Sequence, residues 1–75
     1  MKNMKDIDKL NNLFERTMNN CLCYEREGKK MSLLNEIGCL RGIAYCLEEL
    51  GVCAHENGEF LRMIKIQQDM KNSEI

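Results

Sequence analysis

The chain has 75 residues, of which 44% are hydrophobic and 31% are charged, and its formal net charge is −1. This length and composition predict one small globular domain covering residues 1–75. The near-balance of charge argues against a protein that binds nucleic acid or an anionic membrane surface, because such binding needs an excess of basic residues on one face. A chain this short buries only about 60% of its unfolded surface, and many domains of this size depend on a metal, disulfides or self-association.

The first residues, MKNMKDIDKL, lack the apolar segment of a secretory signal. No uncharged run approaches the roughly 18 residues of a membrane-spanning helix. Five cysteines in a chain without an export signal favour a reducing compartment and free thiols. We therefore expect a cytoplasmic protein that makes no membrane contact and holds no cofactor.

The first apolar pattern predicts an amphipathic helix over about residues 6–27. Apolar side chains recur every three or four residues on one side, as they do where a helix covers a core. Gly28 follows at the position where a left-handed residue commonly ends a helix. The stripe consists of Ile7, Leu10, Phe14, Met18 and Cys21, with Thr17 within it.

A second helix is expected over about residues 33–50, and it is apolar around most of its circumference. Ser32 is a suitable N-cap, because its hydroxyl can accept hydrogen bonds from the free backbone N–H groups of the first turn. Gly51 is placed to end the helix, and Val52 can supply the usual apolar contact. The stripe expected to face the core contains Leu33, Ile37, Leu40, Ala44 and Leu47.

The opposite face of this second helix carries Leu34, Gly38, Gly42 and Tyr45, with Arg41 beside them. Each glycine inside a helix costs about 1 kcal/mol relative to alanine. A helix bears that cost more readily where another backbone or a ligand must come close. Three occupants remain open: a helix of the same chain, a helix of a second copy, or a ligand. We expect the helix to be covered on both sides.

The connection between the first two helices is short, which predicts an antiparallel two-helix hairpin. Residues 52–58 could form one helical turn or a loop. Asn57-Gly58 is typical of a turn or cap, and a shorter third helix is expected over about residues 59–71. The predicted fold is all-α: the hairpin plus the shorter third helix, assembled as a homo-oligomeric helical bundle that is a homodimer or larger.

The cysteines suggest a zinc site only weakly. Cys21, Cys23, Cys53 and His55 have the ligand types of a tetrahedral site. Residues two apart on a helix point in nearly opposite directions, however, so Cys21 and Cys23 could not both reach one metal ion. We expect Cys21 in the core, Cys23 on the surface and no bound metal. Three further thiols repeat every seven residues and are interpreted as small buried hydrophobes, with a redox or intermolecular disulfide role as the alternative: Cys39, Cys46 and Cys53.

No arrangement of residues in the sequence predicts catalysis. The only histidine, His55, falls in an expected turn, and no serine, cysteine or lysine has an evident partner for a nucleophilic mechanism. Gly38 and Gly42 lie within a helix and not between a strand and a helix, so they do not form a phosphate-binding loop. We expect a protein that is not an enzyme.

The segment from Ala54 to Ile64 has part of the residue spacing of a DNA-binding helix-turn-helix motif. Ala54, Gly58 and Ile64 match the small, turn and core positions of that motif, but Asn57 and Glu59 occupy positions that should be apolar. The segment also carries no basic excess. DNA binding is therefore not the preferred hypothesis.

The face around Gly38 is the strongest candidate for a functional surface. Our first hypothesis is a small non-catalytic interaction protein that binds a host protein through this face or through acidic helix ends. Abundant Asn, Lys and Ile without Pro or Trp suggest an AT-rich gene, and an inhibitor or adaptor of a phage or mobile element, for example a counter-defence factor, fits the size. The residues expected at this interface are Leu34, Gly38, Arg41, Gly42 and Tyr45.

The alternative function is an oligomer that sequesters a small anionic ligand such as a signalling nucleotide. Arg41 would contact a phosphate and Tyr45 would stack on a base, with Lys29 or Lys30 as further phosphate contacts. Because Arg41 and Tyr45 are one turn apart, the guanidinium can also stack on the ring. A plainer interpretation leaves Tyr45 half-buried and pairs Arg41 with Glu48 or Glu49.

Overall fold

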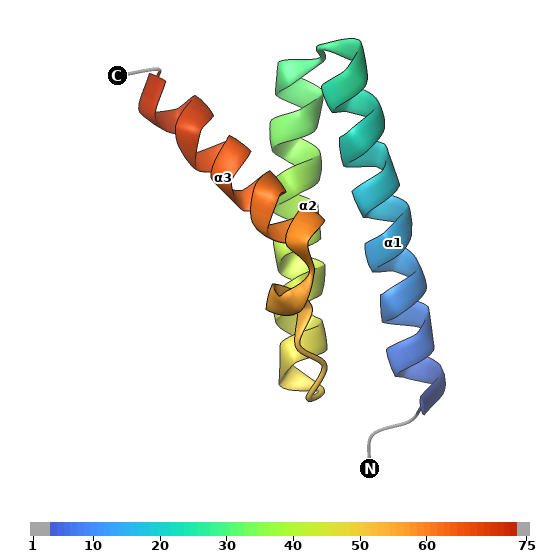
Figure 1. Ribbon diagram of the computed structural model, residues 1–75. Coiled ribbons are helices and arrows are strands. Elements are labelled where there is room, and N and C mark those ends of the chain that lie inside the picture. Colours follow the sequence, from blue (N-terminus) through green and yellow to red (C-terminus); the bar gives the residue numbers. More distant parts are fainter. Residues whose placement is uncertain (1–3, 74–75) are drawn as a thin grey trace.

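The computed structural model describes residues 4–73, which are all-α and contain no strand, so the predicted class is confirmed. Helix α1 spans Met4–Glu27, α2 spans Lys30–Glu49 and α3 spans Gly58–Ser73, with a short 3₁₀ helix, η1, at Ala54–Glu56. In Figure 1, α1 and α2 lie side by side and run in opposite directions, while α3 crosses at an angle and points away from α1 at its C-terminal end. Within this part of the chain, none of the helices has both the length and the apolarity to cross a membrane.

The turn between α1 and α2 consists of Gly28 and Lys29. Gly28 has a φ of 72°, a left-handed conformation that glycine adopts without steric cost. The N–H groups of Gly28 and Lys29 donate to the carbonyls of Glu25 and Tyr24, at 3.2 and 3.0 Å. This pair of bonds is a Schellman motif, and it confirms that Gly28 ends the first helix.

The predicted N-cap at Ser32 is wrong, because α2 begins at Lys30. Lys29 occupies the cap position without any side-chain hydrogen bond, and its carbonyl accepts a bond from the N–H of Leu33 at 2.9 Å. Ser32 therefore lies within the first helical turn, where it cannot take the extended backbone conformation that a capping residue needs. The second helix starts as soon as the Gly28 turn has reversed the chain.

The C-terminal end of α2 follows the prediction closely. Gly51 has a φ of 88°, its N–H donates to the carbonyl of Glu48, and the N–H of Val52 donates to the carbonyl of Leu47, both at 2.9 Å. Val52 is also packed against the core. The apolar contact that commonly accompanies a Schellman motif is thus present beside its hydrogen bonds.

The segment after Gly51 contains a single helical turn, η1, and then the cap of α3. The Asn57 side-chain oxygen accepts hydrogen bonds from the backbone N–H groups of Glu59 and Phe60, at 2.9 and 3.1 Å. These bonds satisfy two of the free donors at the start of the helix, so Asn57 is an effective N-cap. α3 begins at Gly58, one residue before the predicted start.

The core lies where α1, η1 and α3 cover the buried face of α2. The predicted stripe of α2 supplies its centre, with Ile37 and Leu40 both 0% exposed. Two polar bridges join the helices at the surface: Asn20 Nδ2 donates to Glu36 at 2.8 Å, and Arg62 donates to Glu25 at 2.6 Å. The remaining buried apolar residues are Phe14, Met18, Cys21, Leu33, Ala44, Leu47, Ala54, Phe60 and Met63.

Candidate interaction surface

One face of α2 is left uncovered by the other described residues, and we call it the open face. Both of its glycines, Gly38 and Gly42, are exposed, and a Cβ built on either would meet nothing within 4 Å. The hypothesis that these glycines seat another helix of the same chain is therefore wrong, since α1 and α3 both pack on the other half of α2. The open face consists of Met31, Asn35, Gly38, Gly42, Tyr45 and Cys46.

The open face differs in chemistry from an ordinary solvated helix surface. From Met31 to Cys46 this face carries no charged residue, and the exposed Glu49 follows it in the last turn of the helix, whereas most of the exposed residues of α1 are lysine, arginine, aspartate or glutamate. Met31 and Tyr45 have exposed fractions of 72% and 64%, and only Leu13 and Leu61 join them as exposed large hydrophobic side chains among the described residues. Methionine and tyrosine are enriched at protein interfaces, while charged residues are depleted from interface cores.

Arg41 points toward α3 and away from the glycines. Its guanidinium donates a hydrogen bond to the Gln67 side-chain oxygen at 2.7 Å, in a partly buried position. The plainer interpretation predicted a carboxylate of Glu48 or Glu49 as the partner, and an amide takes that place because α3 crosses beside Arg41. Tyr45 is exposed and not half-buried.

Arg41 and Tyr45 do line a common cavity of about 150 Å³ between α2 and α3. The same cavity contains Glu48 and His55, and Nδ1 of His55 is hydrogen-bonded to the Glu48 carboxylate. The His55 ring also packs edge-on against Phe60, with centroids 5.4 Å apart. His55 thus joins η1 to α2 and α3. The Glu48 carboxylate also lies in the same cavity as Arg41, the residue proposed to contact an anion.

The two lysines proposed as phosphate contacts lie far from Arg41. Lys29 and Lys30 are exposed at the N-terminal end of α2, and Lys29 forms an ion pair with Glu27 at 3.6 Å. Eleven residues of helix separate Lys30 from Arg41, which is about 16 Å along the axis at 1.5 Å per residue. One molecule therefore does not bring these cations together.

The possible zinc ligands are also not assembled. Cys21 is completely buried and Cys23 is exposed, as predicted. Throughout residues 4–73, no group of three or more His, Cys, Asp or Glu side chains is placed to hold a metal ion. The interpretation of three other thiols as small buried hydrophobes is wrong, because all of them are exposed: Cys39, Cys46 and Cys53.

The buried thiol of Cys21 leads to a prediction about pH. Burial, followed by the nearby Glu36 and Cys39, raises its pKa from 9.0 to about 11. The raised pKa favours the folded state below pH 9, and that contribution is lost as the pH rises through 11. Over this range we expect the free energy of unfolding to fall by about 2–3 kcal/mol more in the native chain than in Cys21→Ala.

Urea unfolding at several pH values from neutral to alkaline measures this difference. Cys23→Ala is the matched control, because it removes an exposed thiol from the same helix and should keep the pH dependence of the native chain. Equal slopes for the native chain and Cys21→Ala would contradict the prediction.

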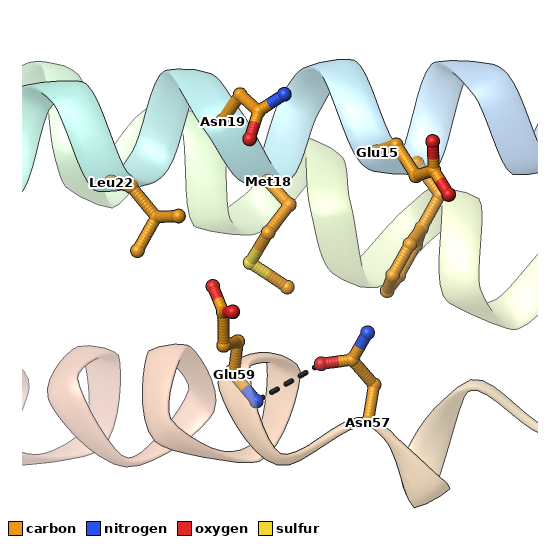
Figure 2. Close-up of a pocket in the computed structure, with 7 residues that line it drawn as sticks. Glu15, Met18, Asn19, Leu22, Asn57 and Glu59 are labelled. Carbon is orange, nitrogen blue, oxygen red and sulfur yellow. Dashed lines mark hydrogen bonds between the residues drawn. The ribbon is translucent and has the colours of Figure 1, made fainter.

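A second concave region, about 240 Å³ in volume, lies between α1 and the start of α3 and was not predicted. In Figure 2, Met18 and Leu22 point from α1 toward α3, while Glu59 points from α3 toward α1. No sequence signal could have located it, because it exists only through the angle at which α3 crosses α1. Its volume is below the roughly 300–1,000 Å³ of typical small-molecule pockets. The other lining residues are Phe14, Glu15, Asn19 and Asn57.

Comparison of the chain with protein-family models, with curated proteins and with solved structures gives no match.

Proposed function

We propose that this chain is a non-catalytic interaction protein that binds another polypeptide through the open face of α2. The observation that carries the proposal is the exposure of a helix face that has no charged residue from Met31 to Cys46 and contains two glycines about one turn apart. Each of these glycines costs about 1 kcal/mol of helix stability relative to alanine. Among residues 4–73, nothing uses the close approach that they permit.

The composition of the open face also suits a polypeptide partner. Tyr45 presents a large ring with a polar hydroxyl, and tyrosine is over-represented among the residues that dominate binding energy. Gly38 and Gly42 have no side chain, so the backbone of a partner's helix could approach α2 closely beside Tyr45. From this surface and from the size of the chain, we infer that the protein is encoded by a phage or mobile element and acts as an inhibitor or adaptor of a host protein.

The alternative of a sequestered anionic nucleotide has less support. Arg41 already donates to Gln67, and the cavity that it shares with Tyr45 holds the Glu48 carboxylate, which would repel a phosphate. The cavity volume of about 150 Å³ is also below the range of typical ligand sites. We therefore favour a protein partner.

Affinity capture from a bacterial host lysate, followed by mass spectrometry, tests this proposal. We expect Tyr45→Ala to reduce the recovery of a specific partner by at least about tenfold, because truncating an interface tyrosine commonly costs 2 kcal/mol or more. The helical circular-dichroism signal should remain, since Tyr45 is 64% exposed.

Leu13→Ala provides the matched control, because Leu13 is an exposed apolar residue, 42% exposed, on α1. This variant should capture the partner as the native chain does. If the native chain and Tyr45→Ala recover equal amounts of the partner, the open face is not the surface that binds it.

A further inference from the structure

We infer that Asn57-Gly58 is a site of chemical modification, at which the Asn57 side-chain amide is converted to aspartate and isoaspartate when the start of α3 detaches. While α3 is docked, its N-cap protects the same amide. Asn57-Gly58 is the only Asn-Gly pair in the sequence, and both residues are exposed, so water reaches them. The inference goes beyond the proposed function, because it does not involve the open face.

The reaction needs only the chain itself and water. The backbone nitrogen of Gly58 loses its proton and bonds to Cγ of Asn57. The Cγ–Nδ2 bond breaks, and the side-chain amide takes up that proton and leaves as ammonia. Water then opens the resulting five-membered imide ring, either at Cγ to give aspartate, or at the main-chain carbonyl carbon of Asn57 to give isoaspartate. Glycine favours the attack, because no Cβ shields its nitrogen.

The backbone conformation of Asn57 prevents this attack in the folded chain. Ring closure requires the Gly58 nitrogen and the Asn57 Cβ to be eclipsed about the Cα–C bond. For an L-residue, eclipsing these atoms requires a negative ψ outside the regions that residues ordinarily occupy, whereas Asn57 has a ψ of 115°. The Gly58 nitrogen is therefore turned away from Cγ, and the backbone must rotate before the new bond can form.

The side chain of Asn57 is also held in place. Its oxygen accepts hydrogen bonds from the N–H groups of Glu59 and Phe60, at 2.9 and 3.1 Å, and Figure 2 shows the first of these. Rotation about ψ of Asn57 moves every residue that follows it, including Phe60, which is 1% exposed in the core. The attack therefore requires Phe60 to leave the core, which couples modification to local unfolding of α3.

The two products have opposite effects on the cap. Aspartate keeps it, because Asn and Asp are about equally good N-caps and a negative charge is favourable at a helix N-terminus. Isoaspartate adds one carbon to the main chain between η1 and α3, so the capping oxygen no longer matches the two N–H groups in position. The isoaspartyl chain therefore docks α3 less firmly, and the modification records irreversibly that α3 has opened.

Peptide mapping of folded and urea-unfolded protein, both incubated at mildly alkaline pH, tests this inference. Trypsin cleaves after Arg41 and Arg62, and the peptide of residues 42–62 contains no asparagine other than Asn57. Mass spectrometry of this peptide therefore measures modification at one site, and reversed-phase chromatography separates its aspartyl and isoaspartyl forms. We expect the folded chain to react at least about tenfold more slowly than the unfolded chain, because only the open fraction reacts.

Phe60→Ala should bring the reaction without urea to at least about tenfold above the native rate, because it weakens the docking of α3. Leu61→Ala is the matched control, since Leu61 is the next residue and is 47% exposed, and it should react at the native rate. If Phe60→Ala does not fold, the comparison of folded and urea-unfolded native chain still decides the question.

Gly58→Ala tests the chemistry separately from the fold. A Cβ on Gly58 meets nothing within 4 Å, so the variant should keep the native structure. In urea it should react at least about tenfold more slowly than the native chain, because the added Cβ shields the attacking nitrogen.

Hydrogen exchange compares the two products. Asn57→Asp, which has the side chain of the aspartyl product, should keep the protection of the α3 amides, whereas the purified isoaspartyl form should lose it. Equal rates of modification in the folded and the unfolded chain would overturn the inference, because the cap would then give no protection. Absence of either product in urea would also overturn it, because the site would then not be reactive.

Discussion

Replacement of Phe60 by alanine is expected to lower the free energy of unfolding by about 3–5 kcal/mol, the usual cost of removing a buried phenylalanine. Phe60 is 1% exposed, and its ring makes edge-on contacts with the rings of Phe14 and His55 at centroid distances of 5.5 and 5.4 Å. It therefore joins α3 to both α1 and η1. Domains of this size have total stabilities of about 4–11 kcal/mol, so the loss would be a large fraction of the whole.

Urea unfolding followed by circular dichroism measures this effect, and amide hydrogen exchange locates it. Because Phe60 is the anchor at the start of α3, we expect amides of α3 to lose protection before those of α1 and α2. Leu61→Ala is the control, because Leu61 is the next residue and is 47% exposed. A loss of similar size in both variants would show that Phe60 is not the anchor that its contacts indicate.

Replacement of Leu40 by alanine is expected to cost about 2–5 kcal/mol, because the side chain is fully buried at the middle of α2. The spread reflects how far the surrounding side chains can move into the space left behind. In a domain of 60–100 residues, each kcal/mol lowers the melting temperature by about 4–8 °C. The melting temperature of Leu40→Ala should therefore fall by at least about 8 °C.

Leu13→Ala makes the same chemical change at a site that is 42% exposed, and it should cost less than about 1 kcal/mol. Thermal unfolding of the two variants under identical conditions separates the effect of burial from that of the leucine itself. If Leu13→Ala is destabilised as strongly as Leu40→Ala, the division of α1 and α2 into core and surface sides is incorrect.

The ends of the helices were largely predictable, because the signals that set them act within a few residues. Gly28 and Gly51 end α1 and α2 by taking positive φ angles of 72° and 88°, and Asn57 caps α3 through its own side chain. The wrong prediction of an N-cap at Ser32 has a local cause as well. Its residue type suits a cap, but the Gly28 turn completes the reversal of the chain earlier and leaves Ser32 inside the helix.

The core stripes were also predictable from the sequence. Apolar residues that recur every three or four positions must share a side of a helix, and the five residues assigned to the core stripe of α2 are all buried. The same argument separated Cys21 in the core from Cys23 on the surface. Helical periodicity is a property of the chain itself and does not depend on where the neighbouring helices lie.

Only the tertiary structure decided which faces of α2 are covered. This helix is apolar on both sides, and periodicity cannot say whether a neighbour is present, so the exposure of Gly38, Gly42 and Cys46 became visible only when α1 and α3 were in place. The bond from Arg41 to Gln67 likewise depends on the angle at which α3 crosses α2. The sequence by itself determined the fold class, the core stripes and most helix ends, because local backbone chemistry and periodicity set them. The open face was decided by the tertiary structure, because it is the part of α2 that contacts with residues far away in the chain do not cover.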